Sequence, residues 1–214
     1  MSAFPNLFSP ITIRNLEIKN RIVFTGHMTY LNEGIPGDRL VAYHGTRAAG
    51  GTGLIVTEVA GVHSSAYYSP NMIDASDPAC IPGYRRVAES VHREGTRIFA
   101  QLFHPGREIK MSSDGTTPTA YSASASANER FHLTPRAMPK RLIREIVEGY
   151  GTSAGHIQQS GLDGVEIVAS QGYLPAQFLN PGVNRRDDRY GGSFTNRLRF
   201  LKEIVDSIRI QTDD

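Results

Sequence analysis

The 214-residue sequence has one cysteine, no apolar run long enough to span a membrane and no block of like charge. The single cysteine, Cys80, excludes an internal disulfide and any cysteine-ligated cluster held by this chain alone. The net charge of +2, with Lys and Arg spread along the chain, does not favour nucleic acid as a partner. Pro5, Pro10 and early charges are unlike a signal or transit peptide, so we expect a cytoplasmic protein.

No linker rich in Pro, Gly or Ser divides the chain, so we expect a single domain. Hydrophobic residues make up 39% of the sequence and charged residues 21%, which is typical of a globular protein with a sizeable core. The histidines, His27 and His104 among them, show no metal-ligand spacing, and no metal site is predicted.

Apolar patterns predict a regular alternation of strands and helices. Loose alternation over residues 11–18 predicts a small hairpin that comes before the first core strand. Ser193 is the expected N-cap of the last helix. The core strands are predicted at about 22–24, 53–61, 97–107 and 163–168, and the helices at about 38–49, 84–94, 140–160 and from 194 onward.

The strands are apolar on both faces, which predicts parallel strands covered by helices. A doubly wound sheet and a (β/α)8 barrel both accept this order, and both gather ligands at the carboxyl ends of the strands. The stretch "EIVASQGYLPAQFLNP" changes from apolar to polar at such an end, where Gln171 and Tyr173 lie. The sequence therefore predicts a site there.

Three strand ends carry unusual residue sets, "TGHMTY", "QLFHPGR" and "SQGYLPAQFLNPGVNRRDDRYGGS". In this order they resemble the Old Yellow Enzyme family of FMN-dependent oxidoreductases. The resemblance favours the TIM-barrel type, of which about the first four βα units and an N-terminal β-hairpin are present. "SQGYL" is more similar to the branch of 2,4-dienoyl-CoA reductase and trimethylamine dehydrogenase. Val168 and Gln171 replace the His pair of the simple ene reductases, so that oxyanion clamp is at best half present.

The resemblance also implies which residues bind the flavin. Gly26, His27 and Met28 match the segment beside the isoalloxazine ring, and Val59 matches a backbone contact. Gln101 matches a glutamine that bonds the pyrimidine edge of the flavin, a task that suits an amide because it offers both a donor and an acceptor. Where some relatives have a cysteine that attaches FMN covalently, this chain has methionine, so we expect non-covalent FMN.

The resemblance implies that NAD(P)H is the reductant and that Tyr173 protonates a substrate carbon. A phenol with a reference pKa near 10 stays protonated at neutral pH, which suits that task. Gln171 is expected to donate a hydrogen bond to a substrate oxygen, to support Tyr173, or only to hold the loop. Arg and Asp pairs in "NRRDDRYGGS" are expected to order the loop before the last helix.

The sequence stops after "IRIQTDD", where the barrels of the family continue. We therefore expect residues 1–214 to be the N-terminal half of an FMN-binding barrel. In the family, the phosphate site and any iron–sulfur ligands lie downstream. An open half-barrel exposes two strand edges, so we expect self-association or a complementing C-terminal half. The activity implied is reduction of an activated C=C bond, such as an enoyl or dienoyl thioester, or oxidative demethylation of an N-methylated amine. The alternative is a non-catalytic half-barrel with a structural or interaction role.

Overall fold

The computed structural model describes residues 4–109 and 114–212. An N-terminal hairpin comes first, as the alternating pattern predicts. Its strands β1 (Ile11–Ile13) and β2 (Leu16–Ile18) pair antiparallel through a tight turn in which Arg14 adopts a φ of 54°.

The central sheet contains four parallel strands, whose order in space is their order in the chain. They are β3 (Val23–Phe24), β4 (Leu54–Gly61), β6 (Arg97–Phe103) and β9 (Gly164–Ile167). A short strand, β5 (Ile73–Asp74), pairs with the end of β4. A doubly wound sheet reverses its strand order, whereas a barrel does not. The order therefore fits the barrel type.

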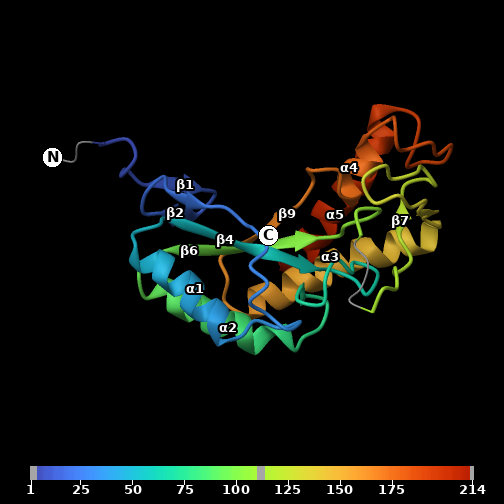
Figure 1. Ribbon diagram of the computed structural model, residues 1–214. Coiled ribbons are helices and arrows are strands. Elements are labelled where there is room, and N and C mark those ends of the chain that lie inside the picture. Colours follow the sequence, from blue (N-terminus) through green and yellow to red (C-terminus); the bar gives the residue numbers. More distant parts are fainter. Residues whose placement is uncertain (1–3, 110–113, 213–214) are drawn as a thin grey trace.

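Four long helices follow the four parallel strands. They are α1 (Asp38–Ala49), α2 (Cys80–His92), α3 (Lys140–Gln159) and α5 (Phe194–Thr212). In Figure 1, α1 and α2 lie side by side beneath the sheet. The N-cap expected at Ser193 is confirmed, because its Oγ accepts a hydrogen bond from the N–H of Asn196 at 3.3 Å.

Three details differ from the sequence prediction. Helix α2 begins at Cys80, four residues before the predicted start, because Pro82 lies in the first turn, where a missing N–H costs nothing. A short helix, α4 (Leu174–Leu179), was not predicted; it has a proline in its first turn. Two short strands, β7 (Tyr121–Ser122) and β8 (Arg136–Ala137), pair within the long segment between β6 and α3.

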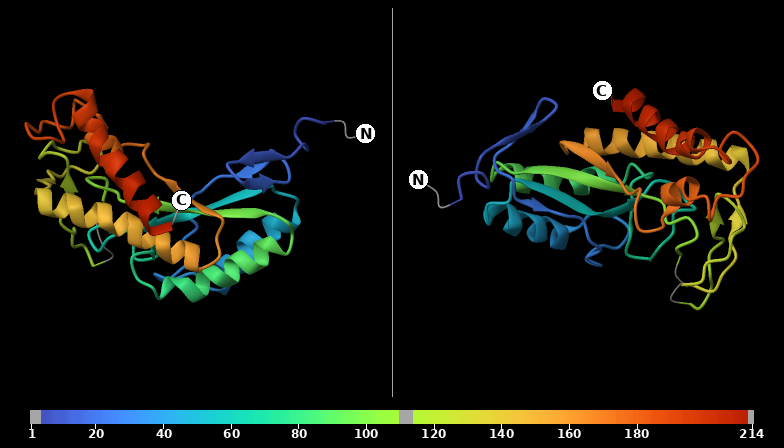
Figure 2. Two further views of the ribbon diagram at one scale, coloured as in Figure 1. Left: turned by 180° about the vertical axis from the view of Figure 1, so that it is seen from behind. Right: turned by 90° about the horizontal axis from the view of Figure 1, so that it is seen from above.

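The helices cover one face of the sheet, and the other face is more open (Figure 2). The difference between the two faces is seen in the alternating burial of side chains along β6. Ile98, Ala100 and Leu102 are fully buried, and they belong to the core that the helices help to form. Phe99 and Gln101 point to the other side and are half-buried. In a closed barrel this second face would be the interior.

The loop before α5 is ordered by the expected ion pairs. The guanidinium of Arg186 binds both carboxylate oxygens of Asp188, at 3.0 and 2.7 Å, and Arg189 donates to Glu203 at 2.7 Å. Hydrogen bonding to Arg186, the largest cause, lowers the pKa of the Asp188 carboxyl below its ordinary value. The prediction for "NRRDDRYGGS" is confirmed.

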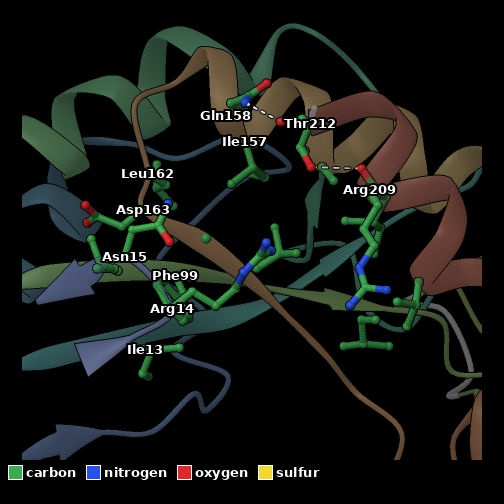
Figure 3. A pocket seen from close by; sticks show the side chains of 17 residues that line it. Ile13, Arg14, Asn15, Phe99, Ile157, Gln158, Leu162, Asp163, Arg209 and Thr212 are labelled. Carbon is green, nitrogen blue, oxygen red and sulfur yellow. Dashed lines mark hydrogen bonds between the residues drawn. The ribbon is translucent and has the colours of Figure 1, made fainter. Parts of the chain in front are cut away.

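A cavity of about 570 Å³ lies along the outer edge of β9 and not at the polar strand ends. Among the described residues, β9 pairs only with β6, so this edge has no partner strand. The hairpin, α3 and α5 form the other walls. In Figure 3, Arg14 and Arg209 extend into the same space from the hairpin and from α5. We call this cavity the edge groove.

Within 4–109 and 114–212, no helix is long and apolar enough to cross a membrane. The same part of the chain holds no group of three or more His, Cys, Asp or Glu side chains placed to bind a metal ion. Burial, together with Asp74 and Asp77, raises the pKa of the Cys80 thiol to about 11, so this thiol stays protonated at neutral pH.

Candidate active site

Gly26 and Gln101 meet where the first three core strands end. A Cβ on Gly26 would lie 2.5 Å from the carbonyl oxygen of Thr57 and 3.0 Å from Nε2 of Gln101. Real Cβ atoms essentially never show a contact as short as the one to Thr57, so the close approach requires glycine. The structure thus brings together two of the residues that the resemblance implies for flavin binding.

Gln101 lies in register with Val59 on one side and Glu166 on the other. Its amide Nε2 donates a hydrogen bond to the carboxylate of Glu166, so both side chains lie on the open face. The ladder shifts register between Val56 and Val59, and this irregularity allows the end of β4 to change direction before the loop. Val59 itself is half-buried.

Tyr173 lies at the start of α4, after a turn in which its N–H bonds the carbonyl of Ser170 at 3.1 Å. Its ring packs edge-on against Phe103, with centroids 4.6 Å apart at 85°. Phe103 is two residues along β6 from Gln101, so both side chains leave the strand on the same side. The phenol of Tyr173 and the amide of Gln101 are therefore on the same side of the sheet.

The phenol is held in its protonated form. Burial, the largest cause, and then the neighbouring Tyr68 raise the pKa of Tyr173 to about 12. Glu108 also acts to raise this pKa, and Arg130 acts to lower it. At neutral pH the hydroxyl therefore carries the proton that a general acid needs.

Of the other three predicted residues, His27 and Gln171 have exposed side chains. The imidazole Nε2 of His27 lies 2.8 Å from the hydroxyl of Tyr43, which places the ring against α1. Met28 is half-buried. Gln171 is exposed and adopts a φ of 57°, in the left-handed region. For His27, contact with a flavin would thus depend on its backbone more than on its ring.

Glu58 was missed by the sequence prediction. It is 1% exposed, and its carboxylate accepts hydrogen bonds from the N–H and the Oγ1 of Thr29, at 2.5 and 2.6 Å, and from the amide of Asn32. It therefore ties the loop after β3 to the end of β4. Burial raises its pKa, an effect that the bonds from Thr29 oppose. The signal was available, since Glu58 is the one charged residue in an apolar strand.

His104 was considered in the sequence only as a possible metal ligand, and the structure gives it another role. It is fully buried, and its Nδ1 accepts a hydrogen bond from the N–H of Gly106 at 3.0 Å. Nε2 therefore carries the ring proton and donates to Oγ of Ser65, at 3.0 Å. The Ser65 hydroxyl in turn lies 2.8 Å from Nδ1 of His63. His104 thus ties the loop after β4 to the end of β6.

Lowering the pH should destabilise the fold, because the ring of His104 is buried in its neutral form. Burial, with a smaller effect from His63, lowers its pKa from 6.5 to about 3, so the folded ring stays neutral while the unfolded one binds a proton. The free energy of unfolding should therefore fall as the pH drops from about 6.5 toward 3. In NMR titrations from pH 8 to 4.5, the His104 ring signals should stay at their neutral positions. A His104 midpoint near 6.5 would contradict this.

Gln177 joins the loops that follow β6 and β9. Its side chain is 1% exposed; Nε2 donates to the carbonyls of Pro105 and Gly172, at 3.0 and 2.7 Å, and Oε1 accepts from the N–H of Arg107 at 3.2 Å. Gly172 directly precedes Tyr173, so these bonds fix the turn that carries the phenol. The sequence prediction missed this residue together with α4.

Parallel strands in chain order, helices on one face and polar residues at the carboxyl ends together define the first four units of a (β/α)8 barrel. The family model described as "NADH:flavin oxidoreductase / NADH oxidase family" matches residues 6–213. The chain belongs to this family of oxidoreductases, which is the Old Yellow Enzyme family that the motifs resemble.

The chain is similar to two curated relatives and to one solved structure. A metal reductase of Desulforamulus reducens is 39% identical over 206 residues, covering 95% of this chain and 30% of that protein. An N,N-dimethylglycine/sarcosine dehydrogenase of Chromohalobacter salexigens is 33% identical, covering 99% and 31%. A 2-naphthoyl-CoA reductase bound to 2-naphthoyl-CoA superposes with a TM-score of 0.90 at 29% identity, covering 97% and 34%. The chain thus spans about a third of the length of each.

The residues present fit one edge of a flavin. Glycine at position 26 keeps the carboxyl ends of β3 and β4 free of side-chain bulk beside the Gln101 amide. That amide is half-buried and offers a donor and an acceptor, which match a ring edge carrying both.

Proposed function

We propose that residues 1–214 form the N-terminal half of an FMN-binding barrel in an NAD(P)H-dependent oxidoreductase. The proposed reaction is reduction of an activated C=C bond, such as that of an enoyl or dienoyl thioester. One observation carries this proposal: the Gln101 amide and the Tyr173 phenol lie on the same side of the sheet, with Phe103 linking them. The family membership and the aryl-CoA thioester bound to the naphthoyl-CoA reductase support it.

In this proposal FMN is bound non-covalently, and it supplies hydride transfer when bound. The backbone of Gly26, His27, Met28 and Val59 would lie beside it, and the Gln101 amide would form hydrogen bonds with its edge. The carboxylate of Glu166 accepts a hydrogen bond from the amide Nε2 of Gln101 and so fixes the orientation of that amide.

Tyr173 gives its phenolic proton to the substrate carbon, and the exposed Gln171 is available to donate to a substrate oxygen. Val168 is buried and apolar, so it cannot assist. An iron–sulfur cluster would need ligands from a C-terminal part, because this chain has one cysteine.

Oxidative demethylation of an N-methylated amine is the second candidate reaction. It needs no carbonyl clamp, so the apolar Val168 does not count against it. The dimethylglycine/sarcosine dehydrogenase of Chromohalobacter salexigens favours it. Both reactions use the same flavin edge.

A non-catalytic half-barrel remains the alternative from another class. The edge groove and the unpaired edge of β9 support it, since they offer a surface for a second copy or for a complementing half. If this alternative holds, the purified protein should be colourless and should self-associate through the unpaired edge of β9.

The test co-expresses this chain with the part of the Desulforamulus reducens relative that follows the aligned region. We expect a complex that co-purifies with a flavin absorbance band, bleaches with NADH or NADPH, and recovers with an enoyl thioester. Bleaching of the oxidised flavin by dimethylglycine as electron donor, in place of bleaching by NAD(P)H, would favour demethylation. A complex that forms without flavin would favour the non-catalytic alternative.

A further inference from the structure

Tyr68 lies against the proposed proton donor although it comes from a different loop. Its ring is edge-on both to Phe103, at 5.6 Å and 89°, and to Tyr173, at 6.4 Å and 89°. With the contact between Phe103 and Tyr173, the three rings form a closed set, each touching the other two. We call these residues the aromatic triad.

The loop that carries Tyr68 is fixed, which gives the triad a defined geometry. Three residues earlier in the same loop, the Ser65 hydroxyl accepts a hydrogen bond from the buried ring of His104. The N–H of Ala66 also bonds the carbonyl of His63 at 2.7 Å. Because His104 and Phe103 are neighbours at the end of β6, one strand end positions both the loop and the ring against which Tyr68 packs.

We propose that Tyr68 is a positioning residue for the proton donor: its side chain, packed against both Tyr173 and Phe103, fixes the position and the surroundings of the Tyr173 hydroxyl. This deepens the proposed function and rests on it. Once hydride has been added to one carbon of the C=C bond, the electron pair left on the other carbon takes the phenolic proton of Tyr173 and forms the new C–H bond. The phenolate left on Tyr173 then takes a proton from water. Over one cycle, a single proton passes from solvent to substrate.

The charges around Tyr173 agree with this assignment. Besides burial, its pKa is raised by Tyr68, through both charge and hydrogen bonding, and by Glu108, while Arg130 lowers it. Glu108 is itself held by the amide of Asn128 at 2.9 Å. Tyr68 is therefore the neighbour whose removal should change the protonation of Tyr173 most.

The experiment measures this protonation on the 214-residue chain by fluorine NMR after labelling with 3-fluorotyrosine. Fluorine lowers the pKa of every phenol and so moves the titration away from strongly alkaline pH. Tyr173→Phe identifies the resonance. We expect Tyr68→Phe, which keeps the ring, to lower the Tyr173 midpoint by about half a pH unit or more. An unchanged or higher midpoint overturns the proposal.

Tyr67→Phe is the matched control, because it removes a hydroxyl from the adjacent residue, and we expect no change in the midpoint. An equal change in that control would overturn the proposal. If Tyr68→Phe fails to fold, Ser65→Ala is the second variant: it releases the loop from His104 and should shift the midpoint in the same direction. Since none of these measurements needs flavin, they fail or succeed independently of the proposed activity.

Discussion

Replacing Tyr173 with phenylalanine should slow alkene reduction by a factor on the order of 10²–10⁴, the range expected when a general acid is lost. The ring contact with Phe103 is kept, so only the proton donor is removed. Bleaching of the flavin by NAD(P)H requires no proton from this phenol and should keep its rate. Stopped-flow absorbance on the co-expressed complex separates the two half-reactions.

Tyr121→Phe is a suitable control, because Tyr121 lies on β7, outside the aromatic triad. It should leave both rates unchanged. Equal slowing of both half-reactions by Tyr173→Phe would instead mean that Tyr173 shapes the flavin site and does not act as the acid. Unchanged rates of both half-reactions would show that Tyr173 is not the proton donor.

Replacing Gln177 with methionine should lower the free energy of unfolding by about 2–4 kcal/mol. Methionine has a similar size but cannot bond the carbonyls of Pro105 and Gly172 or the N–H of Arg107, and each unpaired buried group costs about 1–3 kcal/mol. Urea unfolding monitored by circular dichroism gives the change, provided that the slope with denaturant is unchanged.

The matched control is Gln159→Met at the exposed end of α3, which should change stability by less than about 0.5 kcal/mol. A loss below about 1 kcal/mol for Gln177→Met would show that water replaces the lost bonds and that the two loops are joined by other contacts. Fluorine NMR of the Tyr173 signal would then show whether the turn at Gly172 still holds its position.

Long, strongly patterned segments were predictable from the sequence. Helix α1 has the predicted bounds, and β4 and β9 fall within one or two residues of theirs. For β4 the reason is burial on both faces, which leaves an apolar run that is typical of a strand. Helix α4 was not predictable in the same way. Its six residues are too few for a helical period, and it is stabilised by tertiary bonds such as those of Gln177.

The candidate site was predictable in part. The resemblance pointed to Gly26, Gln101 and Tyr173, and the structure places these three on one side of the sheet. It did not reveal that the His27 ring packs against α1, because a side-chain direction depends on local backbone angles. Glu58, His104 and Gln177 hold the loops through contacts between residues far apart in sequence, and no local pattern encodes such contacts.

The chain-order sheet has a consequence for biosynthesis. Every core strand finds its partner in the strand made just before it, so no pairing has to wait for a distant segment. A ribosome-bound chain is therefore able to consolidate each unit as it emerges. The polypeptide is thus suited to stepwise folding from its amino end, because the core strand formed last has a free edge with which the next core strand pairs.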